Sequence, residues 1–172
     1  MLAEKLFVVV LLLGLMGYAV VSDLRHHRIP NRLVLLGLLL GLADQAYFSG
    51  LAGFGSGMAG ALCSFAIFIP IYALGGMAAG DVKLMAMVGA FCSPGGAVWA
   101  ALLSLIAGGF CGILLVVLRG QLKQTLVRYW LMLKVRTYLV PGADDVAGRP
   151  FPYAIAIFLG TLTSLFWLPV SQ

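Results

Sequence analysis

The segment Leu6–Ser22 reads LFVVVLLLGLMGYAVVS and contains no charged residue before Asp23. At a rise of about 1.5 Å per residue, a helix of this length approaches the hydrocarbon thickness of a bilayer. A single lysine, Lys5, precedes the run and no small-x-small cleavage site closes it, so we interpret it as a retained membrane helix. The composition agrees, because 62% of the 172 residues are hydrophobic and 10% are charged, whereas about 25% are charged in a typical soluble domain.

Further apolar segments predict an all-α, polytopic membrane protein with about six transmembrane helices. The predicted helices cover residues 6–22, 33–47, 55–74, 82–92, 95–118 and 152–168. The fourth helix is short because Ser93-Pro94-Gly95-Gly96 is a strong turn signal. We expect one membrane domain over residues 1–172, in which Asp81 starts its helix below the membrane surface.

Basic residues separate the two sides of the predicted membrane. With six spans, the segments 23–32, around Asp81 and 119–151 fall on one side and carry ten of the eleven lysines and arginines. The positive-inside rule makes this side cytoplasmic. Within the loop 119–151, residues 121–135 have apolar side chains at helical spacing, which predicts an amphipathic helix on the cytoplasmic surface. Membrane lipids are therefore expected partners, whereas nucleic acid is not, since no basic run is interleaved with aromatics.

Neither metal nor disulfide chemistry is indicated. Cys63, Cys92 and Cys111 are odd in number, lie in apolar stretches and form no C-x-x-C pair, so we expect them to face the core or lipid. His26 and His27 are adjacent on a basic loop, where solvated histidines are more common than metal ligands. We expect no metal and no cofactor.

Asp23 and Asp81 are the strongest candidates for chemistry. Both lie at predicted helix ends on the cytoplasmic side, and an ionisable group at membrane depth is costly enough to suggest a function. Taken singly, Asp81 could be the N-cap of a helix that starts at Val82, and Asp23 could pair with a neighbouring arginine or be solvated. Together they offer the pair that peptide hydrolysis requires, one to deprotonate water and one to support the carbonyl. The helix dipole favours an ionised Asp81 and a protonated Asp23.

The residues around both aspartates resemble a known family. The relevant stretches are Asp23-Leu-Arg-His-His-Arg-Ile29-Pro30-Asn31, Gly75-Gly-Met-Ala-Ala-Gly-Asp81-Val-Lys83-Leu84 and Arg149-Pro-Phe-Pro-Tyr153-Ala154. In order and spacing they resemble the type IV prepilin peptidases, most closely the short branch that serves Flp/tight-adherence pili. The resemblance implies that Asp23 and Asp81 are the catalytic residues of an aspartic endopeptidase. It also implies that this enzyme removes leaders of prepilins or pseudopilins at the cytoplasmic face of the bacterial inner membrane.

Two departures from the family pattern accompany this resemblance. Ala78 replaces the first glycine of the Gly-x-Gly-Asp motif, which adds a methyl group where the backbone approach is expected to be tight. The chain also lacks the cytoplasmic insert with paired C-x-x-C motifs that the long branch carries. The resemblance therefore implies peptidase activity without N-methyltransferase activity.

Five further residues are expected to bind substrate or shape the site. They are Gly80, Lys83, Pro30, Asn31 and Tyr153. We expect Lys83 to partner a lipid headgroup or a carboxylate, and Asn31 to cap the second predicted helix.

Two other functions remain open at the level of sequence. A proton- or cation-coupled transporter could use the two aspartates as a relay. Such a transporter is expected to have polar residues deep in several helices, whereas the helices predicted here are nearly free of charge. A non-catalytic subunit of a pilus or secretion assembly would tolerate the loss of either aspartate.

Overall fold

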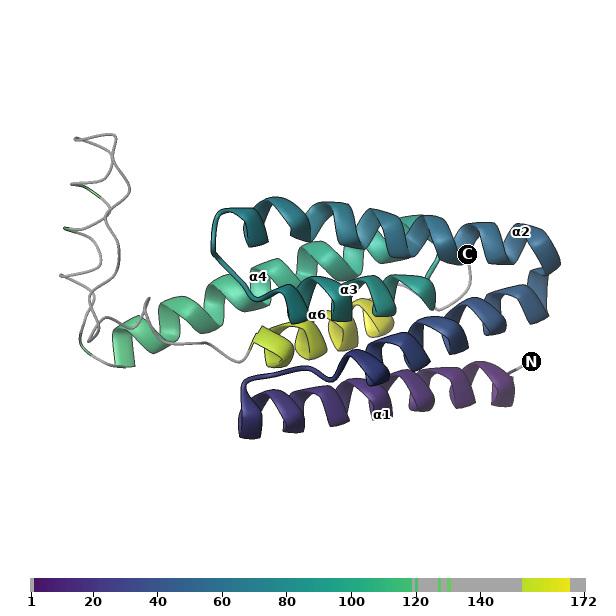
Figure 1. Ribbon diagram of the computed structural model, residues 1–172, viewed down its shortest axis with the longest axis horizontal. Coiled ribbons are helices and arrows are strands. Elements are labelled where there is room, and N and C mark those ends of the chain that lie inside the picture. Colours follow the sequence, from purple (N-terminus) through teal and green to yellow (C-terminus); the bar gives the residue numbers. More distant parts are fainter. Residues whose placement is uncertain (1, 119, 121–126, 128–129, 131–152, 168–172) are drawn as a thin grey trace. The chain divides into compact units, whose positions relative to one another are not determined.

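The computed structural model describes residues 2–118, 120, 127, 130 and 153–167, and this part of the chain folds into helices joined by short turns (Figure 1). The helices are α1 (Leu2–His26), α2 (Asn31–Ala73), α3 (Ala79–Ala90), α4 (Pro94–Leu118) and α6 (Tyr153–Trp167). The all-α prediction is thereby confirmed. The predicted amphipathic helix over residues 121–135 falls almost entirely outside the described residues.

The chain divides into two units, one of residues 1–108 with 152–172 and one of residues 109–151. Asp23, Asp81 and α6 all belong to the first unit. In the second unit, the structure describes the end of α4, whose side chains at Phe110, Ile113 and Leu118 are largely exposed.

Helix α2 consists of two helical stretches that are separated by a sharp break. Ser49 (φ −132°, ψ 15°) and Gly50 (φ 60°, ψ −142°) leave helical geometry, and the chain reverses direction there (Figure 1). A residue without Cβ adopts the positive φ of Gly50 with little strain. The two stretches correspond to the predicted helices 33–47 and 55–74.

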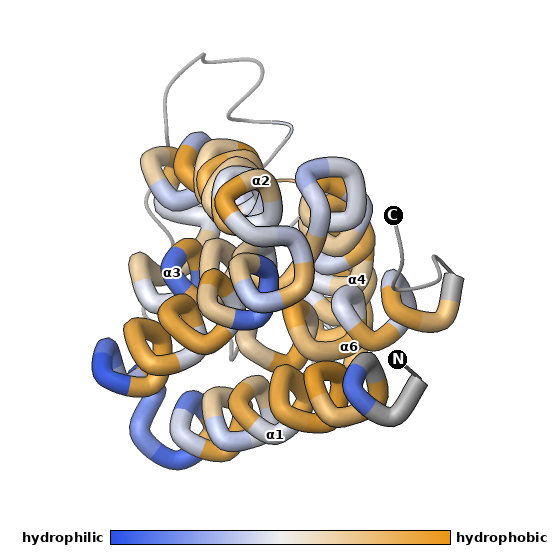
Figure 2. The backbone as a smooth tube through the Cα atoms, turned by 90° about the vertical axis from the view of Figure 1, so that its right-hand side faces the viewer, coloured by the Kyte–Doolittle hydropathy of each residue, from blue (hydrophilic) through white to orange (hydrophobic). Residues whose placement is uncertain are grey.

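Three described helices are long and apolar enough to cross a membrane: Leu6–His26, Asn31–Ala73 and Pro94–Leu118. Helices α3 and α6 have 12 and 15 residues and are shorter, so the prediction of six spans is not confirmed. Hydrophobic colours dominate the helices in Figure 2, and many large apolar side chains are exposed on α1, α2 and α4. Such a surface is typical of a protein that contacts lipid.

Helix α3 is the most enclosed helix of its unit and packs mainly against α2. Four of its apolar side chains are completely buried: Leu84, Met85, Met87 and Val88. The two helices approach closely at Gly60 of α2 and Gly89 of α3, where a Cβ on Gly60 would press on the Gly89 carbonyl oxygen and lie 2.7 Å from the Cys92 carbonyl oxygen. Small residues at such a crossing allow backbones to approach closely.

The Gly60→Ala variant is expected to lower stability by about 1–3 kcal/mol, because the added methyl group must separate α2 from the backbone of α3. Gly55→Ala is the matched control on the same helix, since a Cβ there meets nothing within 4 Å. Thermal unfolding in detergent measures both. Equal melting temperatures for the two variants would contradict the close contact.

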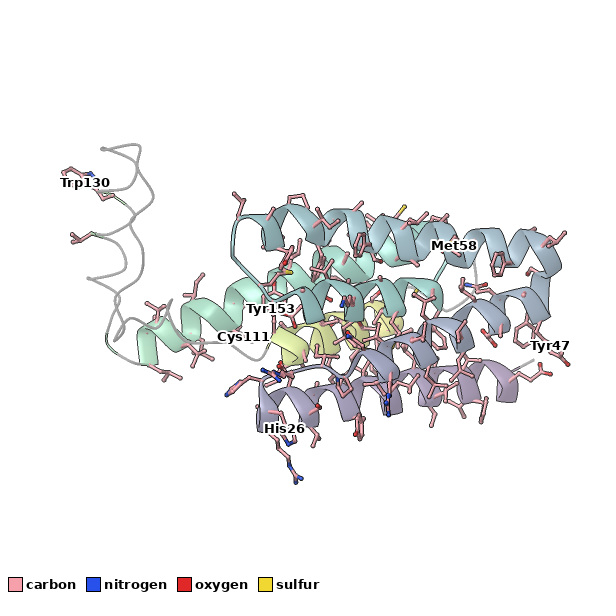
Figure 3. The ribbon with its side chains drawn as sticks, viewed as in Figure 1. His26, Tyr47, Met58, Cys111, Trp130 and Tyr153 are labelled. Atoms are coloured by element: carbon pink, nitrogen blue, oxygen red, sulfur yellow. The ribbon has the colours of Figure 1, made fainter. Side chains whose placement is uncertain are left out.

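The C-terminal end of α1 and the N-terminal ends of α3 and α6 lie at the same end of the first unit (Figure 1). Figure 3 shows His26 and Tyr153 toward this end, whereas Tyr47 lies at the opposite end, near the break in α2. This arrangement brings residues from three distant parts of the sequence together at one end of the first unit.

Candidate active site

Asp81 lies in the first turn of α3 and is 4% exposed. Its side-chain Oδ2 accepts a hydrogen bond from the Ala78 N–H at 3.0 Å, and its own N–H donates to the Ala78 carbonyl oxygen at 3.1 Å. The helix starts at Ala79 with Ala78 as its N-cap, so the alternative that Asp81 itself is the N-cap is wrong. The carboxyl group instead occupies the third helical position, from which it reaches back to an otherwise unpaired donor.

Ala78 fits its position without strain. Its backbone adopts φ −83° and ψ 155°, an extended conformation that is open to any L-residue. The glycine of the family motif is therefore not needed here for backbone geometry. Gly80 is similar, since a Cβ there would lie 3.4 Å from the Ile29 Cβ, an ordinary contact.

The Ala78→Gly variant is expected to keep activity within about twofold, because the N–H that donates to Asp81 is retained and glycine is at least as good an N-cap as alanine. Ala78→Pro removes that N–H and is expected to lower cleavage by about tenfold or more, as a hydrogen bond to a carboxyl group is lost. Rates of leader cleavage, the activity that the resemblance implies, provide the measurement for the two variants. A fully active Ala78→Pro variant would show that this hydrogen bond is dispensable.

Asp23 lies three residues before the end of α1 and is 8% exposed. Its Oδ2 accepts a hydrogen bond from the backbone N–H of Ala154 at 3.4 Å. Ala154 belongs to the first turn of α6, where N–H groups have no partner within the helix and the dipole favours a negative charge. Asp23 therefore lies in the last turn of α1 and faces the N-terminus of α6.

The carboxyl group of Asp81 has a raised affinity for its proton. Burial raises the pKa of Asp81 to about 7, the Ala78 N–H opposes this rise, and the negative charge of Asp23 adds to it. The two carboxyl groups are thus close enough for the charge of one to act on the other. This direction runs against the expectation of an ionised Asp81, because the cost of desolvation outweighs the hydrogen bond from Ala78.

The segment between α1 and α2 contacts the N-terminal part of α3. Lys83 Nζ donates a hydrogen bond to Asn31 Oδ1 at 3.2 Å, and Ile29 packs against Gly80. Pro30 is the N-cap residue of α2, and no side-chain bond caps that helix. Asn31 therefore does not cap α2 as predicted, but links it to α3.

Tyr153 packs against α2 and α4 at the start of α6. Its ring lies edge-on to Phe68, with ring centroids 6.3 Å apart. Its hydroxyl end packs against Gly108, where an added Cβ would clash with it. These contacts anchor the first turn of α6, whose next residue donates to Asp23.

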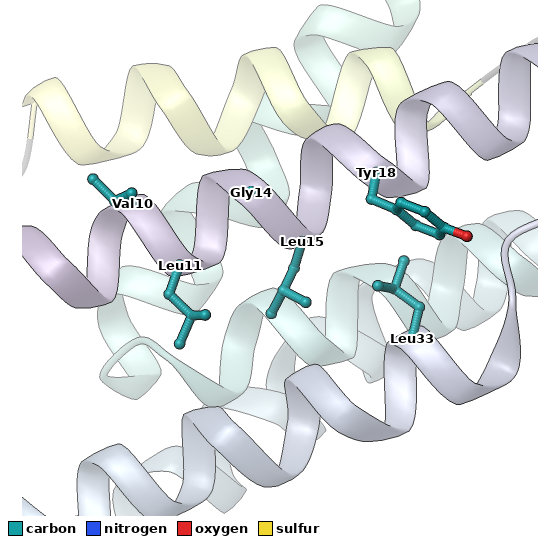
Figure 4. A pocket seen from close by; sticks show the side chains of 6 residues that line it. All are labelled: Val10, Leu11, Gly14, Leu15, Tyr18 and Leu33. Carbon is teal, nitrogen blue, oxygen red and sulfur yellow. The ribbon is translucent and has the colours of Figure 1, made fainter.

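A shallow apolar groove of about 440 Å³ lies between α1 and α2 (Figure 4), and neither aspartate is among the residues that line it. It is lined by Val10, Leu11, Gly14, Leu15, Tyr18 and Leu33. In the described part of the chain, no three His, Cys, Asp or Glu side chains gather as a metal site would require. Two carboxyl groups, each held by a backbone N–H, are the reactive groups that the described site offers.

Comparison with protein-family models places this pair in context, since residues 10–117 match the type IV leader peptidase family. The chain belongs to that family. The matched region contains Asp23, Asp81, Lys83 and Asn31 and ends before α6. Comparisons with curated proteins and with solved structures gave no match.

Family membership bears out the resemblance read from the motifs and makes a leader-peptidase type of function the one to test. Ala154 is a site residue that the sequence analysis missed as a functional donor. Its contribution is a backbone N–H, which has no side-chain signature. The only sequence signal for it is the helix start that follows Pro150 and Pro152.

Proposed function

We propose that this protein is a membrane aspartic endopeptidase that removes the leader peptide of type IV prepilins or pseudopilins at the cytoplasmic membrane face. The observation that carries the proposal is the pair of buried carboxyl groups, Asp23 and Asp81, from helices far apart in sequence. Membership of the type IV leader peptidase family supports the same reaction class.

In the proposed reaction, the two aspartates have different roles. The ionised Asp23 takes a proton from a water molecule, whose oxygen attacks the carbonyl carbon of the scissile bond. Asp81, which holds its proton up to about pH 7, donates a hydrogen bond to the carbonyl oxygen as negative charge develops there. Asp23 then passes the proton that it took from water to the leaving nitrogen, and the C–N bond breaks to give a free carboxyl group and a free N-terminus.

The proposed orientation places the aspartate end of the helices at the cytoplasmic side of a bacterial inner membrane. Its support is the concentration of Arg25, Arg28, Arg32 and Lys83 around this end. We further propose that the two stretches of α2 cross the membrane separately, and that α3 and α6 complete a six-helix domain with α1 and α4.

The proposed substrates are membrane proteins with an apolar stem beside the leader. The basic leader and the basic rim of the site repel one another, so the acidic pair and anionic lipid headgroups are the groups that offset this repulsion. The proposed enzyme leaves the new N-terminus unmethylated, since no paired C-x-x-C motifs occur in the sequence.

Purified protein in detergent, mixed with a prepilin of the Flp type, tests the proposal. Wild-type protein is expected to release the leader, and mass spectrometry of the product is expected to show an unmethylated N-terminus even when S-adenosylmethionine is present. Failure to cleave any prepilin in a panel that includes long and short leaders would reject the proposed function.

A further inference from the structure

The relative position of the two aspartates is not set mainly by direct packing of their helices. Helix α3 packs chiefly against α2, whereas α1 and α3 touch only in a small area. Helix α6 packs against both α1 and α3, and the elements that bridge these two helices together fix the distance between the carboxyl groups of Asp23 and Asp81. The turn of residues 27–31 joins α1 to α2, and it contacts both α1 and α3.

On the α1 side, two hydrogen bonds hold this turn. The His27 N–H donates to the Asp23 carbonyl oxygen at 2.8 Å, and Ser22 Oγ donates to the Arg28 carbonyl oxygen at 2.8 Å. His27 adopts a positive φ of 49°, which ends the helix abruptly. The start of the turn is thereby fixed to the same helical turn that carries Asp23.

On the α3 side, a hydrogen bond and an apolar contact hold the other end of the turn. Lys83 Nζ donates to Asn31 Oδ1 at 3.2 Å, and the Ile29 side chain covers Gly80. Gly80 and Lys83 flank Asp81 in the sequence. The turn therefore spans from the Asp23 helix to the residues on both sides of Asp81.

We propose that the turn 27–31 is a brace that sets the separation of the two carboxyl groups, with Lys83 and Asn31 as its positioning residues. This inference rests on the proposed function for its effect on catalysis, but its structural part does not. Lys83 follows Asp81 by two residues and so projects from a different face of α3. It is also exposed while Asp81 is buried, so its role is to hold the brace and not to contact the reacting atoms.

A double-mutant cycle tests the brace. Lys83→Met and Asn31→Ala are each expected to lower kcat by about tenfold with KM unchanged, because a hydrogen bond to a charged group is lost while the substrate surface is not. The double variant is expected to match the single variants, since both remove one interaction. Asn31→Asp keeps an acceptor for Lys83 and is expected to retain kcat within about twofold.

Arg32→Met is the matched control, because it removes an exposed cation from the residue next to Asn31 without touching the brace. It is expected to leave kcat unchanged. Independent kcat losses that multiply in the double variant would overturn the inference, as would losses that appear in KM or an Arg32→Met effect equal to that of Lys83→Met.

A distance measurement tests the brace without any activity. Spin labels are attached to cysteines at the exposed positions Leu24 and Ala79, after Cys63, Cys92 and Cys111 are replaced by serine. The distance distribution is expected to broaden in Lys83→Met and Asn31→Ala and to narrow again in Asn31→Asp. Unchanged distributions would overturn the brace, whereas absent cleavage by wild-type protein with broadened distributions would reject only the proposed function.

Discussion

Replacement of Asp23 or Asp81 by asparagine is expected to reduce leader cleavage by at least about 10³-fold, because each variant removes one half of the proposed acid–base pair. Asparagine keeps the size of the side chain and an oxygen that can accept the hydrogen bonds from Ala154 or Ala78. It can neither take a proton from water as Asp23 would nor supply the acidic proton of Asp81. Single-turnover cleavage of a prepilin in detergent provides the measurement.

Two controls make this result specific. The double variant is expected to be no slower than either single variant, because residues that act as one unit have non-additive effects. Asp44→Asn, close to the break at Ser49 and Gly50 that ends the first stretch of α2, is expected to cleave normally. Cleavage by both Asp23→Asn and Asp81→Asn at the wild-type rate would show that the catalytic pair is elsewhere, whereas a transporter or assembly subunit would show no cleavage with wild-type protein either.

The stability of the folded protein is expected to fall as the pH rises from about 4 to about 7. The folded-state pKa of Asp81 is about 7 and its ordinary value is 3.8. Below pH 3.8 both folded and unfolded chains bind the proton, so the favourable contribution is fully present there. As the pH rises above 3.8, the unfolded chain loses its proton while the folded chain keeps it. The free energy of unfolding therefore falls until the pH passes the folded-state pKa of Asp81.

The size of this effect follows from the two pKa values. Their difference of about 3 pH units corresponds to at most about 4 kcal/mol. Asp81→Asn cannot ionise, so its stability is expected to be flatter with pH and to exceed that of wild-type protein at pH 8. Unfolding in mixed micelles at pH 4, 6 and 8 measures both proteins, and parallel pH curves would contradict the raised pKa.

The helices were largely predictable because long apolar runs and turn residues leave strong signals. The predicted helices 82–92, 95–118 and 152–168 compare with α3 at Ala79–Ala90, α4 at Pro94–Leu118 and α6 at Tyr153–Trp167. The start of α3 was placed three residues late, since Ala79 and Gly80 look like part of a glycine-rich turn. Helices α3 and α6, with 12 and 15 residues, are shorter than the three helices that are long enough to cross a membrane.

The site was predictable only where side chains carry the chemistry. The sequence pointed to Asp23 and Asp81, and the structure places both in buried positions near one another. The sequence does not predict the hydrogen bond between Lys83 and Asn31. These residues are 52 positions apart, so their contact depends on how the helices pack. The expectation of an ionised Asp81 weighed the helix dipole and left out the cost of desolvation, which raises the pKa of Asp81.

The hydrogen bonds to Asp23 and Asp81 described here both come from the main chain, at Ala154 and Ala78. A backbone donor is kept in almost any amino-acid substitution, because every residue except proline supplies the same N–H. The residues that supply these two N–H groups can therefore change while Asp23 and Asp81 keep their hydrogen bonds. A motif defined by side chains will thus understate how far members of the family can diverge, and the alanine at position 78 is a case of this tolerance.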